Sequence, residues 1–140
     1  MKTILMVDDS RLAMRGYQTR LSRECDVIRC YSAMEALAKS VGGAVKVDLL
    51  LLDVMMPPDP YGIEETQGGL ATGIFLAKDL RAQYEKVPLI FLTNVVPADI
   101  ERMARTFASA IVIAKVECTP MCLMERVRDI LCIDAPSDRR

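Results

Sequence analysis

The sequence predicts an α/β protein with a doubly wound, five-stranded parallel sheet. Two observations carry this prediction. Short apolar runs alternate along the chain with helix-like stretches, giving five strand–helix units. Four of the runs are also continuous rather than alternating, which is typical of parallel strands buried on both faces. The predicted strands cover residues 4–7, 27–30, 47–52, 88–92 and 110–114.

The helix starts are marked by capping residues and prolines. Ser10 and Ser32 are expected to cap the first two helices, and Pro97 is a favoured residue for the first turn of the fourth. Thr119 followed by Pro120 marks the start of the last helix. The predicted helices end near residues 23, 40, 84, 108 and 133, and the third starts near residue 70.

Hydrophobic spacing indicates which helix faces are buried. In the first helix, the buried face is predicted to hold Leu12, Met14, Tyr17 and Leu21. In the last, Leu123, Val127 and Leu131 are predicted to point inward.

Length and composition fit one globular domain. The chain has 140 residues, 51% of them hydrophobic, and a net charge of −1, which does not favour nucleic acid as a partner. It has no apolar run long enough to span a membrane and no secretory signal. Its five cysteines lack a disulfide framework spacing, so we expect reduced thiols and a cytoplasmic location.

The domain is expected to cover residues 1–133, with a polar tail at 134–140. A proline- and glycine-rich insertion at about 57–69 is too long for a simple strand–helix turn, and segments of that length tend to be functional. It could serve as a lid or as a docking surface.

Polar residues follow the predicted strands: Asp8 and Asp9 the first, Asp53 the third, Thr93 the fourth and Lys115 the fifth. In an open α/β sheet, ligands bind beyond the carboxyl ends of the strands, so these side chains are expected to meet. Clustered carboxylates repel unless a cation lies among them, and Mg²⁺ prefers oxygen ligands. Three carboxylates, one Mg²⁺ and one lysine have formal charges that sum to zero.

This set of groups suits phosphoryl transfer to a carboxylate. Aspartate can form an acyl phosphate, and the transfer mainly requires positioning and neutralisation of the phosphoryl oxygens. The chain contains no histidine, which excludes Ser-His-Asp and Cys-His catalysis within it. A histidine that donates the phosphoryl group would therefore belong to another protein.

Four segments carry a resemblance to a known family. Residues 7–10 (VDDS), 52–57 (LDVMMP), 92–94 (LTN) and 114–115 (AK) resemble, in order and spacing, the motifs of CheY-like response-regulator receiver domains. The resemblance covers nearly the whole chain and implies the flavodoxin-like strand order 2-1-3-4-5. It implies a stand-alone, atypical receiver in two-component signalling.

The resemblance also implies roles for the metal ligands and the partners. Asp53 would be the phosphoacceptor, and Mg²⁺ would bind Asp8, Asp9, Asp53 and the Met55 backbone carbonyl. The donor would be a histidine kinase or a histidine phosphotransfer protein, and an unidentified downstream protein would be the target.

Thr93 and Lys115 would contact the phosphoryl group, but three positions near them depart from the family pattern. Val112 replaces the usual aromatic switch residue, Val116 replaces the proline after the lysine, and Asn94 replaces a very small residue. The phosphorylation residues are all present, so these departures point to atypical output.

Three alternative functions are weighed against this one. A degenerate receiver would bind proteins without phosphorylation. A phosphatase of the haloacid-dehalogenase kind would need a second aspartate where Met55 stands. A flavodoxin-like carrier of FMN is disfavoured because Asp8 and Asp9 would repel the phosphate of the flavin in the absence of a metal. We therefore expect a phosphoacceptor rather than an enzyme that turns over. Its self-dephosphorylation should be slow, because Met55 and Val95 offer nothing to orient water.

Overall fold

The computed structural model describes residues 1–135 and places five parallel strands in one sheet. The strands lie in the order β2-β1-β3-β4-β5, which confirms the order implied by the resemblance. Residues 136–140 of the expected tail lie outside the described part of the chain. The strands are β1 (Thr3–Val7), β2 (Asp26–Cys30), β3 (Leu49–Leu52), β4 (Leu89–Thr93) and β5 (Ala110–Ala114).

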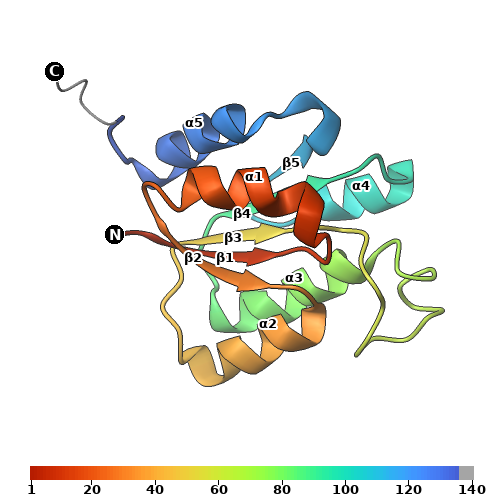
Figure 1. Ribbon diagram of the computed structural model, residues 1–140. Coiled ribbons are helices and arrows are strands. Elements are labelled where there is room, and N and C mark those ends of the chain that lie inside the picture. The colour runs from red at the N-terminus through yellow and green to blue at the C-terminus, as the bar shows by residue number, and fades with distance from the viewer. Residues whose placement is uncertain (136–140) are drawn as a thin grey trace, which may run out of the picture.

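Helices cover both faces of the sheet (Figure 1). Two helices pack on one face and three on the other, and each layer has its own apolar core. The first pair is α1 (Arg11–Leu21) and α5 (Pro120–Leu131). The opposite layer holds α2 (Ala33–Ser40), α3 (Thr72–Gln83) and α4 (Ala98–Arg105), and short 3₁₀ turns are η1 (Val41–Gly43) and η2 (Lys115–Glu117).

The central strands show why their sequences are continuously apolar. In β3, Leu49 and Leu51 belong to the core under α1 and α5, whereas Leu50 and Leu52 belong to the core on the other face. Successive side chains of a strand point to opposite faces, so a strand covered on both sides needs apolar residues at every position. The edge strand β5 is only half-buried along its length.

Two of the predicted caps are confirmed in full. The side chains of Ser32 and Thr119 accept hydrogen bonds from the backbone N–H groups of Glu35 and Cys122. Ser10 does occupy the cap position of α1, but its side chain makes no capping hydrogen bond. Pro97 is the residue before α4 rather than part of its first turn.

Two other details of the sequence-based description were wrong. Leu12 is 79% exposed, because it lies two residues, about 200° of helical rotation, from the buried Met14. Helix α4 ends at Arg105 rather than near residue 108, because the chain must turn back to bring Ala110 into register with Leu89.

None of the helices formed by residues 1–135 has the length and hydropathy that a membrane crossing requires.

Candidate phosphoacceptor site

The candidate site lies at the carboxyl edge of the sheet. Val7 at the end of β1 pairs in register with Leu52 at the end of β3, so the residues that follow them, Asp8 and Asp53, emerge side by side. Thr93 likewise pairs with Ala114, the residue before Lys115. The sheet therefore brings together the residues that the sequence placed at the strand ends.

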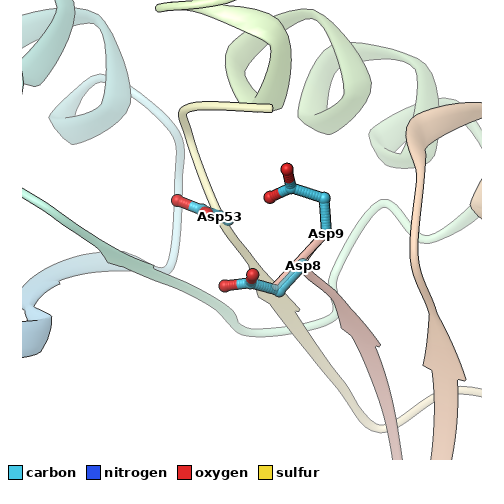
Figure 2. A group of neighbouring side chains, drawn as sticks. All are labelled: Asp8, Asp9 and Asp53. Atoms are coloured by element: carbon cyan, nitrogen blue, oxygen red, sulfur yellow. The ribbon is translucent and has the colours of Figure 1, made fainter. Parts of the chain in front are cut away.

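Three carboxylates meet at this edge, as Figure 2 shows. One oxygen from each of Asp8, Asp9 and Asp53 lies within 4.8 Å of the others. Asp8 and Asp53 are buried, whereas Asp9 is exposed. Buried carboxylates of like charge are costly unless cations balance them, so this cluster has the character of a cation site.

Lys115 supplies part of that balance. Its Nζ atom lies 2.8 Å from Oδ2 of Asp8 and 3.2 Å from Oδ2 of Asp53, and its side chain is only 14% exposed. One ammonium against three carboxylates leaves a formal charge of −2. A single divalent cation would neutralise that remainder.

Backbone groups fix the direction of two carboxylates. The N–H of Ser10 donates to Oδ1 of Asp8 at 2.8 Å, and the N–H of Met55 donates to Oδ1 of Asp53 at 3.3 Å. In each case the side-chain oxygen of the aspartate accepts from the backbone N–H two residues later, a local turn that aspartate readily adopts. These bonds leave the Oδ2 atoms directed at Lys115.

Electrostatics at the site are strongly perturbed. Burial, together with the charge of Asp8, raises the pKa of Asp53 to about 6, while Lys115 acts in the opposite direction. For Lys115, burial lowers the pKa, but attraction to Asp53 and Asp8 outweighs it and the net pKa is raised. A perturbed carboxyl group with a specific charged partner is typical of functional sites.

Two buried oxygen atoms at the site, Oδ2 of Asp8 and Oγ1 of Thr93, make no hydrogen bond of good geometry within the described chain, although Oδ2 of Asp8 lies 2.8 Å from the Lys115 amine. Buried polar atoms are normally satisfied, so both have capacity for a ligand. An anionic oxygen beside two other carboxylates suits a hard divalent cation, and a buried hydroxyl can donate to a phosphoryl oxygen. The residues present therefore fit Mg²⁺ and a phosphoryl group.

Met55 lies beside the acidic cluster. Together with Asp9 it lines a hollow of about 240 Å³, whose other walls come from 56–57 and 68–70. The role of the Met55 carbonyl stays a prediction.

The segment between β3 and α3 forms the outer wall of this hollow and projects from the same edge of the sheet (Figure 1). It is tied to the body of the protein: the hydroxyl of Tyr61 donates to Asp79 at 2.6 Å, and its ring lies 5.7 Å from that of Phe75. Thr66 is completely buried, and its hydroxyl donates to the Gly62 carbonyl at 2.8 Å. The insertion is thus an anchored structure beside the site.

The positions that depart from the family pattern also lie near the site. Val112 and Thr93 line a cavity of about 280 Å³ between β5, the loop that follows β4, and α4. Asn94 is exposed, and Val116, which is 80% exposed, belongs to the η2 turn. This cavity therefore adjoins both Thr93 and the position at which the resemblance expects an aromatic side chain.

Two residues that support the site were not identified from the sequence. A Cβ atom at Gly73 would lie 2.0 Å from the carbonyl oxygen of Asp53, so only glycine permits α3 to approach this closely. A glycine within a helical pattern often has such a packing reason, which was the available signal. Tyr17 contacts the turn that begins at Lys115, and no local sequence pattern predicts a contact between residues so far apart in the chain.

Several solved structures are similar to this protein over most of its length. No protein-family model matches the chain. A CheY-like receiver domain protein from Methanospirillum hungatei has a TM-score of 0.75 at 22% identity, covering 94% of each chain. The chemotaxis protein CheY4 of Vibrio cholerae has a TM-score of 0.71 at 23% identity, covering 94% of this chain and 99% of its own.

A third similar structure is the N-terminal domain of a response regulator/sensory box/GGDEF protein from Carboxydothermus hydrogenoformans. It has a TM-score of 0.67 at 25% identity and covers 94% of this chain and 95% of its own. The protein accordingly has the fold of CheY-like response-regulator receiver domains.

Proposed function

We propose that the protein is a response regulator that accepts a phosphoryl group on Asp53 from a histidine of a partner protein. The observation that carries this proposal is the meeting of Asp8, Asp9 and Asp53 with Lys115, whose amine contacts two of the three carboxylates. The receiver fold supports a role in two-component signalling. The partner would be a histidine kinase or a histidine phosphotransfer protein, because the chain has no histidine of its own.

In the proposed reaction, an oxygen of the Asp53 carboxylate attacks the phosphorus of a phosphohistidine. The new O–P bond forms as the N–P bond breaks, and the histidine nitrogen leaves and takes up a proton. Lys115 balances the charge that the phosphoryl group brings, and the Thr93 hydroxyl donates to one of its oxygens. The Thr93 hydroxyl is buried, and although burial and Asp8 raise the pKa of Asp53 overall, the hydroxyl acts to lower it, which supports this role.

Mg²⁺ would be held by Asp8, Asp9, Asp53 and the carbonyl of Met55. When bound, it would neutralise phosphoryl oxygens and orient them for transfer. The observation that favours a metal here is the cluster of three carboxylates with only one ammonium, that of Lys115, to balance them within the described chain.

We propose that phosphorylation changes binding to a downstream protein, in the cytoplasm. Three of the five cysteines, Cys25, Cys30 and Cys118, are buried, and the absence of a disulfide framework spacing in the sequence supports a reducing compartment. The departures at Val112 and Val116 indicate that this switch differs from one built on an aromatic side chain.

Intact mass spectrometry after incubation with acetyl phosphate and Mg²⁺ tests the proposal. The wild-type protein should gain one phosphoryl group, and the gain should disappear with EDTA or with Asp53→Asn. Asp26→Asn is the matched control, because Asp26 is exposed at the opposite end of the sheet, at the start of β2. A folded wild-type protein that gains no mass would favour the degenerate receiver, a module that binds proteins without phosphorylation.

A further inference from the structure

The position of Lys115 depends on a turn that the sheet alone does not hold. Lys115 follows β5, an edge strand paired only with β4, and it opens the short η2 turn. Val116, the next residue, is 80% exposed and contributes little packing. The amine of Lys115 must nevertheless remain between Asp8 and Asp53, within 3.2 Å of both. Contacts from outside β5 can therefore contribute to holding the turn.

Tyr17 contacts this turn from helix α1. Its hydroxyl donates to the carbonyl of Cys118 and lies 3.4 Å from the carbonyl of Lys115, so one atom reaches both ends of the η2 turn. The turn is also closed by a hydrogen bond from the Cys118 N–H to the Lys115 carbonyl at 3.2 Å. Burial raises the pKa of Tyr17, so the hydroxyl keeps its proton and acts as the donor.

Helix α1 is well placed for this task. Met14 and Leu21 of α1 are buried in the core beneath α1 and α5, which keeps the helix seated on the sheet. A Cβ atom at Gly16 would lie only 3.5 Å from the ring of Pro120, so α1 and the start of α5 are in close contact beside Tyr17. The same helix starts directly after the Asp8–Asp9 pair. It therefore links the acidic half of the site to the turn that presents the lysine.

We infer that Tyr17 is a positioning residue, which holds the η2 turn so that the Lys115 amine stays between the two buried carboxylates. The expected effect on the phosphorylation rate rests on the proposed function. The expected effect on the position of Lys115 does not. Phosphoryl transfer depends on preorganised charge, so a lysine that moves away from Asp53 should slow transfer without weakening binding of a small phosphodonor.

Tyr17→Phe removes the hydroxyl and keeps the ring. The matched control is Tyr84→Phe, because the Tyr84 hydroxyl also donates to a backbone carbonyl, that of Val45 at 2.7 Å, but is remote from the site. Two readouts are compared in each variant. The first is labelling of Lys115 by an amine-reactive reagent, located by peptide mass spectrometry. The second is the rate of phosphorylation over a range of acetyl phosphate concentrations with Mg²⁺ present.

In Tyr17→Phe, labelling of Lys115 should rise several-fold because the amine becomes more exposed. The maximal phosphorylation rate should fall about tenfold, because the free energy of one hydrogen bond corresponds to roughly that factor in rate. The half-saturating acetyl phosphate concentration should not change. Tyr84→Phe should change neither readout. Unchanged labelling in Tyr17→Phe would overturn the inference, whether or not the rate falls. If Lys115 labelling increases in Tyr17→Phe but the wild-type protein is never phosphorylated, the role of Tyr17 is upheld and the proposed function is refuted.

Discussion

Gly73 offers a sharp test of how the site is packed, because it lies where α3 meets the end of β3. A Cβ atom at this position would lie 2.0 Å from the carbonyl oxygen of Asp53, 2.7 Å from Cα of Val54 and 2.9 Å from the carbonyl carbon of Asp53. All three contacts are with backbone, which cannot rotate away. Gly73→Ala therefore forces α3 and the Asp53 segment apart by roughly an ångström.

The expected cost follows from these contacts. Overpacking costs about 3 kcal/mol at the upper end of its usual range. Separation also weakens the hydrogen bond from the Gly73 N–H to the Val54 carbonyl, 2.8 Å long, by about 1 kcal/mol. Alanine regains about 1 kcal/mol of helix propensity. The net loss of unfolding free energy is thus about 3 kcal/mol, or a fall in Tm of about 10 °C.

Gly16→Ala is the matched control for this substitution. Gly16 is also inside a helix, but it is exposed, and a Cβ atom there would be 3.5 Å from its nearest neighbour, an ordinary contact. This variant should gain about 0.5–1 kcal/mol from helix propensity alone. Urea unfolding measures both variants, and the midpoints should move in opposite directions with little change in the m-value. A Gly73→Ala protein as stable as the wild type would refute the proposed packing of α3 against Asp53.

Three further predictions concern other parts of the molecule. Hydrogen bonds from Arg128, with Arg20 contributing less, lower the pKa of Glu24 below its usual value. Glu24→Gln should therefore destabilise the protein at neutral pH, and the difference should shrink as the pH falls below about 4.3 in urea titrations. The guanidinium of Arg81 donates to the carbonyls of residues 84, 87 and 108, so Arg81→Met should lower the unfolding free energy by about 2 kcal/mol, as thermal or urea unfolding would show. Phosphorylated protein should lose its phosphoryl group slowly, because Met55 and Val95 cannot orient water, and decay within seconds by mass spectrometry would contradict this.

The sequence predicted which polar residues meet at the edge of the sheet, but not the residues that support them. Asp8, Asp53 and Lys115 immediately follow apolar strands, and the carboxyl ends of parallel strands share one edge. Their meeting follows from strand order, which local patterns indicate. Tyr17 and Lys115 are instead brought together by packing of α1 against α5, and nothing local records that contact.

Helix boundaries also differ in whether local sequence or tertiary packing determines them. The start of α5 was predictable because Thr119 and Pro120 act locally, through a side-chain cap and a fixed φ angle. The end of α4 was not, because the chain after Arg105 must turn back to bring Ala110 into register with Leu89. That requirement comes from the sheet and overrides local propensity.

The ionised carboxylates of the candidate site should lower the free energy of unfolding, and Asp53→Asn tests this. Burial and Asp8 raise the pKa of Asp53 to about 6, so the ionised form is disfavoured in the folded protein. A carboxyl group with a raised pKa weakens folding as the pH rises through that value. Above about pH 6 in metal-free buffer, Asp53→Asn should raise the Tm by roughly 3–6 °C. Added Mg²⁺ should stabilise the wild type more than the variant and narrow that gap, because the asparagine lacks the third negative charge. A variant that is less stable than the wild type under metal-free conditions would show that the pairing with Lys115 outweighs the repulsion among the carboxylates.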